Sequence, residues 1–292
     1  MIDVHHHIVP QQAPKSLNLP QWSIEEDSET MDRLGIKASL LSVPASGNSE
    51  MVHRINEHLA KLVQHNTKKY GFLASLSLEH IDSSLKQIEF DYHTLHADGF
   101  ILPTNFNGLY LGSDALVPLL NELNRKNAVV LIHPSKPAGD NLPTFDRDLS
   151  VYEYPLETTR AVMDMIYKNR LKQFPNIKWI ISHAGGTIPY LKHRLSIAHE
   201  WNGVSQNENE VLEAISSLYF DLALSTSDNV YHCLKNVTSH THILLGTDFP
   251  LRFETGVSKS LNHIDNTTVF SQSEKQDILY HNAHSLFPRF KI

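Results

Sequence analysis

The stretch that decides the fold lies at the N-terminus, where residues 1–10 read MIDVHHHIVP. The three consecutive histidines stand among apolar, largely β-branched residues, which are typical of a buried strand. A purification tag would carry polar linker residues instead. Because a strand turns alternate side chains to opposite faces, we expect His5 and His7 to point the same way, together with Asp3, and His6 to point away. The pattern therefore predicts a His-x-His motif on one face of a strand.

Short apolar runs bounded by turn residues recur along the chain and predict eight strands. Strands that alternate with helical segments form a parallel sheet, and near-continuous apolar strands are covered on both faces. We therefore expect a (β/α)8 barrel. An open doubly wound sheet is the alternative, although no GxGxxG or GxxxxGK[ST] motif follows any strand. The predicted strands are 2–8, 38–43, 71–76, 99–102, 128–133, 178–183, 218–223 and 242–245.

Helical spacing and capping residues predict helices between these strands. Examples are 28–34, 50–64, 83–95, 114–127, 158–174 and 187–199, and an extra helix is expected at 277–286. No linker, charge block or low-complexity stretch divides the chain, so we expect residues 1–292 to form a single domain. The long irregular segment 134–155 is expected to be functional, because loops of that length in a compact domain usually are.

The composition excludes several classes of partner. The chain of 292 residues has a formal net charge of −7 and no cluster of Lys and Arg of the kind that binds nucleic acid or anionic membranes. Its longest apolar runs, such as 128–132 and 177–181, are far shorter than the roughly 20 residues that span a bilayer. The single cysteine, Cys233, cannot close an intrachain disulfide, and no charged-then-apolar leader precedes Asp3. We therefore expect a soluble, cytoplasmic protein that binds neither nucleic acid nor membranes.

Five side chains suited to metal chemistry fall at the C-terminal ends of the predicted strands, the end of such a barrel that carries active sites. They are His5 and His7, His133 in LIHPS, His183 in IISHAGG and Asp248 in LLGTDFP. Taken singly, each histidine could be a packed strand-end residue and the aspartate a turn or N-cap residue. Taken together they predict a site for a divalent cation, because imidazole nitrogen and carboxylate oxygen are the ligands of a catalytic Zn²⁺.

Longer motifs carry a family resemblance. They are DVHHH, MDRLGI, GFILPTN, VLIHPS, FPNIKWIISHAGGTIPYLKHR and LLGTDFP. Over nearly its whole length the chain resembles the amidohydrolase-related, metal-dependent decarboxylases of the aminocarboxymuconate-semialdehyde decarboxylase type. The stretches LPQWSIEEDSETMDRLGI, NGLYLG and YPLETTRAVMDM look most similar to 6-methylsalicylate decarboxylases. The resemblance implies an amidohydrolase-like barrel and a homodimer.

The resemblance also implies roles for single residues. The metal ligands it implies are His5, His7, His133 and Asp248, with His183 acting beside the metal. Arg194 matches the family arginine that reaches the neighbouring subunit's site and holds a substrate carboxylate, and we assign Asn105 and Trp22 to substrate binding as well. Two departures stand out. No lysine ends the fourth strand, so we expect one metal ion rather than two, and the short stretch between His7 and Trp22 lacks the family's other substrate-binding arginine.

The expected reaction is the non-oxidative decarboxylation of a small hydroxyaromatic or related unsaturated carboxylic acid. Direct loss of CO2 would leave an unstabilised aryl anion, so the ring carbon should be protonated first, with Asp248 as donor and His183 hydrogen-bonded beside it. We expect Zn²⁺, with Mn²⁺ as the alternative. The alternative function is hydrolysis of an ester, lactone or amide by water activated at the same site. A metal-binding barrel without catalysis is a third reading.

Overall fold

The computed structural model describes residues 1–10, 19–139, 142, 145–201 and 203–290, and its centre is an eight-stranded parallel sheet. The strand order is β1-β2-β3-β4-β7-β8-β9-β10, so each strand pairs with the next one of the sheet along the chain. Backbone hydrogen bonds also join the two edges. Val4 N–H donates to Leu245 O (3.0 Å) and His7 N–H donates to Phe249 O (2.7 Å). The predicted (β/α)8 barrel is confirmed.

All eight predicted strands are present, with ends within two residues of those expected. They are β1 (Ile2–His7), β2 (Ala38–Ser42), β3 (Tyr70–Ser75), β4 (Gly99–Pro103), β7 (Val129–His133), β8 (Lys178–Ile181), β9 (Tyr219–Asp221) and β10 (Ile243–Leu244). A short antiparallel hairpin of β5 (Asn105–Phe106) and β6 (Leu109–Tyr110) follows β4 and was not predicted.

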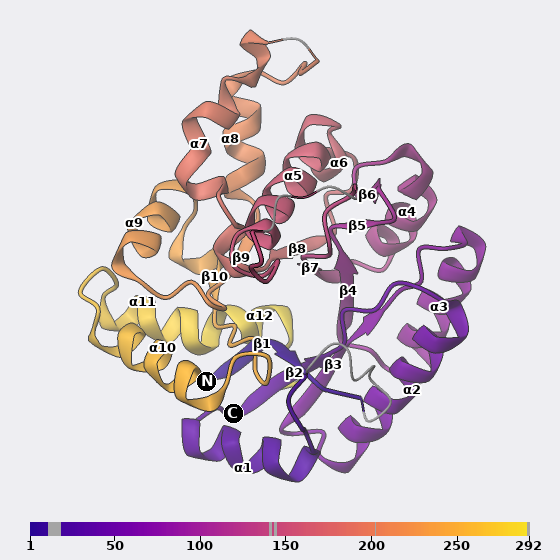
Figure 1. The fold of residues 1–292 in the computed structure, drawn as a ribbon, viewed down its shortest axis with the longest axis vertical. Coiled ribbons are helices and arrows are strands. Elements are labelled where there is room, and N and C mark those ends of the chain that lie inside the picture. Colours follow the sequence, from indigo (N-terminus) through magenta and orange to yellow (C-terminus); the bar gives the residue numbers. More distant parts are fainter. Residues whose placement is uncertain (11–18, 140–141, 143–144, 202, 291–292) are drawn as a thin grey trace.

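Helices surround the strands (Figure 1). They are α1 (Ile24–Leu34), α2 (Ser49–His65), α3 (Ile81–His93), α4 (Val117–Arg125), α5 (Glu153–Tyr167), α6 (Arg170–Gln173), α7 (Ile188–Ser196), α8 (Glu208–Ser216), α9 (Asp228–Val237), α10 (Glu254–Asn266), α11 (Gln272–Gln276) and α12 (Asn282–Leu286). Within the described ranges, none of these helices has the length and apolar character needed to cross a membrane.

Two of the helix predictions were wrong by four or more residues at one or both ends. Helix α1 begins four residues earlier than expected, because the Ser23 side chain caps it by accepting a hydrogen bond from the first turn (3.2 Å). The helix expected at 158–174 begins at Glu153 and is interrupted at Asn169, whose φ of 59° lies in the left-handed region. The chain then continues as the separate helix α6.

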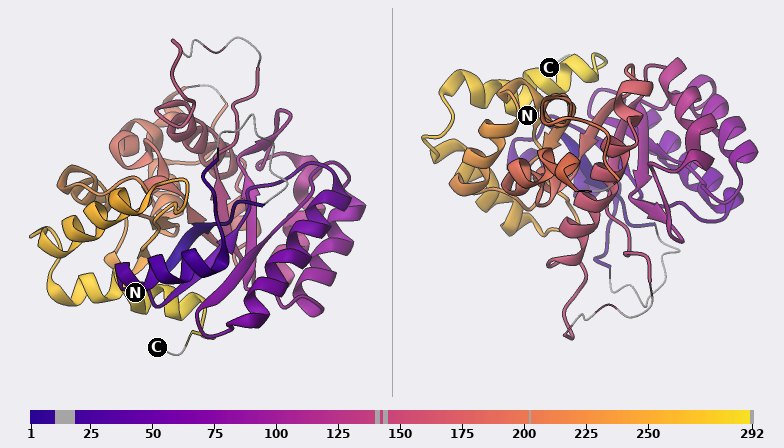
Figure 2. Two further views of the ribbon diagram at one scale, coloured as in Figure 1. Left: turned by 60° about the horizontal axis from the view of Figure 1, so that its bottom comes forward. Right: turned by 90° about the horizontal axis from the view of Figure 1, so that it is seen from above.

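Apolar side chains fill the barrel and close one of its ends. Ile2, Val4 and other strand residues form an interior cluster that also includes Phe287 and Phe290, which follow α12. The N-terminus lies at this end of the barrel, where β1 begins (Figure 2). A second, larger apolar cluster packs helices against the outside of the sheet. The candidate ligands lie instead at the C-terminal ends of the strands, beyond this apolar filling.

A bulge in β1 changes which residues share a face. The pairing with β2 runs Asp3 with Ser39 and then His6 with Leu41, so β1 has one residue more than its partner. Val4 consequently belongs to the barrel interior, while Asp3 turns to the other side and its Oδ2 lies 2.9 Å from His6 Nδ1. The expectation that Asp3 accompanies His5 and His7 was therefore wrong, because simple strand alternation does not survive the bulge.

Candidate metal centre

Four of the predicted residues converge at the C-terminal ends of the strands. The ligand atoms of His5, His7, His133 and Asp248 all lie within 4.8 Å of one another, and the four residues are buried. The Nε2 atoms of His5 and His7 are 3.0 Å apart, and Asp248 Oδ1 lies 3.1 Å from His7 Nε2. The His133 ring centroid is 5.2 Å from that of His5 and 5.0 Å from that of His7. The structure thus brings together the four residues that the family resemblance implied as ligands, all of them at predicted strand ends.

The other nitrogen of each of the three imidazoles is held by an oxygen. The pairs are His5 Nδ1 with Asp221 Oδ2 (2.8 Å), His7 Nδ1 with Ser42 Oγ (3.0 Å) and His133 Nδ1 with Pro134 O (2.9 Å). The Ser42 hydroxyl donates its own proton to His6 O (3.0 Å), so its Oγ is left to accept. Because an oxygen acceptor fixes the proton on Nδ1, each Nε2 presents a lone pair to the centre.

This arrangement of donors fits a divalent cation. Buried lone pairs that face one another at 3.0 Å are unfavourable unless a positive charge lies between them. Asp248 Oδ1 is also buried and has no hydrogen-bond partner in the described part of the chain. Three imidazole nitrogens and one carboxylate oxygen match the ligand preference of Zn²⁺ and of related first-row ions.

The electrostatics of the cluster are dominated by burial and by mutual contacts. Burial lowers the pKa of His5, but the carboxylates of Asp221 and Asp248 outweigh it and raise that pKa to about 10. Burial lowers the pKa of His7, and burial together with neighbouring imidazoles holds the pKa of His133 well below its ordinary value. Burial raises the pKa of Asp248, yet the surrounding imidazoles hold it well below its usual range. Without a cation, a pKa of about 10 places a second proton on His5 at Nε2, and a bound cation would take the place of that proton.

His183 stands beside the ligand set and is not part of it. Both of its ring nitrogens are buried without a hydrogen-bond partner among the described residues. Its Nε2 lies 3.9 Å from Asp248 Oδ2, which is too long for the direct hydrogen bond that we expected. The backbone φ is 54° at His183 and 61° at Asp248, an uncommon conformation for residues other than glycine that concentrates at active sites.

Asp221, at the end of β9, was missed in the sequence analysis. Its Oδ2 holds His5 Nδ1, and its Oδ1 accepts hydrogen bonds from the backbone N–H groups of His183 (3.0 Å) and Ala223 (2.9 Å). It therefore orients one ligand and fixes the residue beside the metal site. Gly246 permits this close packing, since a Cβ there would lie 2.9 Å from His5 Cβ and 3.0 Å from Asp221 Cβ. The available signal was an acidic residue inside the apolar run 218–223.

His6 faces away from the cluster, as predicted, and lies between two carboxylates. Its Nδ1 is 2.9 Å from Asp3 Oδ2 and its Nε2 is 2.8 Å from Asp27 Oδ1. Burial lowers the pKa of His6, but Asp27 and Asp3 outweigh it and raise that pKa to about 10. Trp22 donates its indole N–H to Asp27 (2.9 Å), and Tyr70 donates its hydroxyl (2.8 Å). The Trp22 nitrogen is thus committed to α1, and only its ring is left for a substrate.

Asn105 is likewise occupied by the protein. Its side-chain amide donates to Glu157 Oε1 (2.7 Å) and to Lys136 O (3.0 Å), and its Oδ1 accepts from Gly108 N–H (3.1 Å). These bonds attach the β5–β6 hairpin to the loop that follows His133. The contacts describe a residue that positions this loop, and its predicted role in substrate binding stays a prediction.

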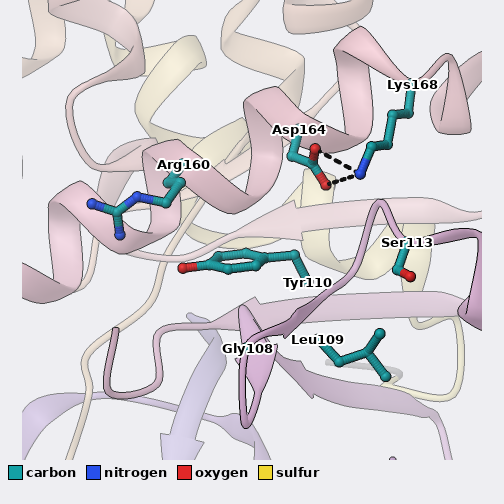
Figure 3. Close-up of a pocket in the computed structure, with 7 residues that line it drawn as sticks. All are labelled: Gly108, Leu109, Tyr110, Ser113, Arg160, Asp164 and Lys168. Carbon is teal, nitrogen blue, oxygen red and sulfur yellow. Dashed lines mark hydrogen bonds and ion pairs between the residues drawn. The ribbon is translucent and has the colours of Figure 1, made fainter. Parts of the chain in front are cut away.

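A cavity of about 370 Å³ lies between this hairpin and α5 (Figure 3). Its two cationic side chains are paired within the protein: Lys168 lies 2.9 Å from Asp164, and Arg160 contacts the buried Glu157. None of the four candidate ligands lines this cavity. It is therefore separate from the candidate metal centre.

Arg194 lies outside the cluster as well. It is exposed, near the end of α7, and its guanidinium carbon is 5.8 Å from the centre of the Trp201 ring. Because α7 begins at Ile188, the arginine is about 9 Å along the helix axis at 1.5 Å per residue. The structure does not bring Arg194 to the metal centre of its own chain.

Comparison with known proteins gives matches over the whole chain. The model of the amidohydrolase family matches residues 2–289. The decarboxylase yanB of Aspergillus niger is 33% identical, covering 100% of this chain and 88% of the relative. A 6-methylsalicylic acid decarboxylase of Penicillium expansum is 32% identical, covering 99% and 97%. A 5-carboxyvanillate decarboxylase of Novosphingobium aromaticivorans, solved with manganese and 4-hydroxy-3-methoxy-5-nitrobenzoic acid, shares the fold with a TM-score of 0.89 at 15% identity, covering 98% and 95%.

The ligand set predicts the metal content of variants. We expect one divalent ion per chain in the purified protein, lost in His133→Ala and kept in His6→Ala, as measured by inductively coupled plasma mass spectrometry. His6→Ala leaves Asp3 and Asp27 without their shared partner, so we expect it to lose about 3–5 kcal/mol of unfolding free energy while keeping the ion. The exposed His65→Ala serves as a control that changes neither quantity. Two ions per chain, or an ion retained in His133→Ala, would contradict the assignment.

Proposed function

We propose that this chain, which belongs to the amidohydrolase family, is a metal-dependent carboxy-lyase. It removes CO2 without oxidation from a small hydroxyaromatic or related unsaturated carboxylic acid. The observation that carries the proposal is the buried set of four ligands with the unpartnered His183 beside it. Relatives named as decarboxylases that are 32–33% identical over essentially the whole chain support the reaction type. We also take residues 1–292 as a single catalytic domain, which the family match over residues 2–289 supports.

We assign one divalent ion to His5, His7, His133 and Asp248, with Zn²⁺ as the expected ion and Mn²⁺ as the alternative. The mixed nitrogen and oxygen donor set supports Zn²⁺, and the manganese in the related 5-carboxyvanillate decarboxylase supports the alternative. When bound, the cation supplies Lewis-acid chemistry, which polarises the carboxylate and the ortho oxygen of the substrate.

The side chains of the chain itself handle the proton. Asp248 donates a proton to the ring carbon that carries the carboxylate. The bond between ring and carboxylate carbon then breaks, its electron pair returns to the ring, and CO2 leaves. The proton taken up by the ring balances the group that is lost, so no oxidant or reductant is needed. His183 lies 3.9 Å from Asp248 Oδ2 with both nitrogens free, so it can bind the substrate oxygen or pass a proton to Asp248.

The proton on Asp248 requires that its contacts change on substrate binding. In the structure the surrounding imidazoles hold the pKa of Asp248 well below its usual range, although burial raises it. A carboxylic acid is therefore retained only when substrate weakens the contacts of Asp248 with His5 and His7. The two carboxylate oxygens already differ, since Oδ1 faces these ligands and Oδ2 faces His183.

We further propose a homodimer in which Arg194 of one subunit enters the site of the other. The support is indirect: Arg194 is exposed on α7 next to Trp201, which is 53% exposed, and Tyr190, four residues before it, is 82% exposed. Large exposed aromatic side chains around a cation are typical of protein interfaces. The cytoplasmic location and the lack of nucleic-acid and membrane partners stay predictions from the sequence.

Product analysis tests the reaction. Protein reconstituted with Zn²⁺ or Mn²⁺ is expected to release CO2 from at least one acid in a panel of hydroxybenzoates, methylsalicylates and muconate semialdehydes, with equimolar decarboxylated product. A hydrolysed ester, lactone or amide without CO2 release would favour the alternative reaction, and no turnover of either kind would favour a binding protein.

His183→Ala is expected to keep its metal and to lose about 10²- to 10⁴-fold in the decarboxylation rate, the usual contribution of a positioned proton-handling group. The measurement is kcat for CO2 release alongside metal content. If the folded variant loses its ion, His183 is a ligand and the proposed role is wrong.

Arg194→Ala is expected to raise KM without changing metal content. Mixing it with His133→Ala under conditions of subunit exchange should restore activity, because the hybrid dimer contains one site with an intact ion and an intact partner arginine. Differently tagged subunits verify that exchange occurs. If the subunits exchange and activity does not recover, Arg194 is a solvent-exposed residue of α7 and does not enter the partner's site.

A further inference from the structure

The loop that follows Asp248 carries an arginine without a partner. The backbone N–H of Arg252 donates to Asp248 O (2.8 Å), which fixes the start of this residue close to the metal centre. The side chain is partly buried, and within the described ranges its guanidinium has no hydrogen bond or ion pair. The nearest acidic residue along the chain, Glu254, is already held at 2.8 Å by both a terminal nitrogen and Nε of Arg33. The charge of Arg252 is therefore left uncompensated.

The start of α10 leaves space for the Arg252 side chain but gives no structural reason for a positive charge at this position. A Cβ on Gly256 would lie 2.8 Å from Arg252 Nε and 3.1 Å from its Cγ, so the glycine leaves the space in which the arginine stem lies. A cation at a helix N-terminus is disfavoured by the helix dipole. Helix stability therefore gives no reason for an arginine at this position.

Electrostatics relate Arg252 to the metal centre. The backbone hydrogen bond from Arg252 to Asp248 O holds the arginine next to that ligand in the loop, and burial lowers the pKa of Arg252 while the carboxylate of Asp248 raises it. Arginine nevertheless stays protonated in proteins. A partly buried cation without a counter-ion has paid a desolvation cost that an anionic ligand would offset.

We propose that Arg252 binds the carboxylate of the substrate in its own subunit. The inference rests on the proposed function, since it places the substrate anion beside Asp248, the assigned proton donor. The planar guanidinium fork suits two hydrogen bonds to a carboxylate. Leu251 and Phe253, which flank Arg252, are 39% and 68% exposed and offer apolar surface to an aromatic ring. The loop thus carries a cation and, at the two neighbouring positions, exposed apolar side chains, a combination that suits an aromatic acid.

Equilibrium binding tests the inference without catalysis. The probes are benzoate, an unreactive aromatic carboxylate, and phenol, which lacks the carboxylate, both measured by calorimetry on metal-loaded protein. Arg252→Gln is expected to weaken benzoate binding by about 10- to 100-fold, the range for losing a hydrogen bond to a charged group, and to leave phenol binding unchanged. Arg252→Lys should recover part of the benzoate affinity. The control is Arg54→Gln, an exposed arginine on α2 that pairs with Glu50, and it should change neither probe.

Each outcome decides a separate point. Unchanged benzoate affinity in Arg252→Gln, an equal loss for both probes, or a wild-type protein that does not bind benzoate would overturn the role of Arg252. The protein could bind benzoate through Arg252 and yet release no CO2 from any acid tested. That result would support the anion site and contradict only the proposed decarboxylase activity. Metal content and melting temperature of each variant show that the centre and the fold are intact.

Discussion

The whole structure depends on the hydrogen bonds between its first strand and the segment that follows its last strand. His5 O accepts from Asp248 N–H (2.9 Å), and His7 N–H donates to Phe249 O (2.7 Å). These backbone contacts close the barrel, and the same contacts place the Asp248 carboxylate against the two imidazoles of β1. Closing the fold and assembling the metal ligands are therefore one event. Residues at opposite ends of the chain cannot pair in this register without also meeting at the centre.

Around this closure, buried polar groups orient the imidazole ligands and hold strand β1 in place. Asp221, Ser42 and Pro134 O each hold one Nδ1 atom, so that every Nε2 faces the centre. On the other side of β1, His6 is fixed between Asp3 and Asp27 and ties the strand to α1. Buried polar networks of this kind are costly when a member is removed, because the remaining groups lose their partners. The ligands are therefore held in one orientation, because any other orientation would leave buried polar groups without partners.

Sequence patterns predicted the strands and the five candidate residues at their ends, because apolar runs report burial and the end of a strand is a local property. The family resemblance then implied which four of the five are ligands. The patterns did not predict the partners of those ligands. Asp221 lies inside an apolar run, and its contact with His5 depends on which strands are neighbours at the close of the barrel. The bulge that turns the Asp3 side chain to the opposite face of β1 depends on the pairing with β2, and no local sequence pattern encodes that pairing. The hydrogen bonds of Trp22 with Asp27 and of Asn105 with Glu157 are likewise contacts that form only in the folded protein, so residue type alone could not reveal them.

The charges of the site explain why a substrate acid needs an arginine. While Asp248 is ionised, its carboxylate and that of Asp221 would balance a divalent cation at the centre, which leaves no net positive charge for a third carboxylate. A substrate carboxylate entering this buried space is therefore stabilised by further cations, and besides the Arg194 proposed to come from the partner subunit, Arg252 in the loop after Asp248 has no partner among the described residues. Loss of CO2 removes the negative charge that the arginine holds. The decarboxylated product then lacks that ion pair, so the reaction itself weakens the contact that retained the substrate.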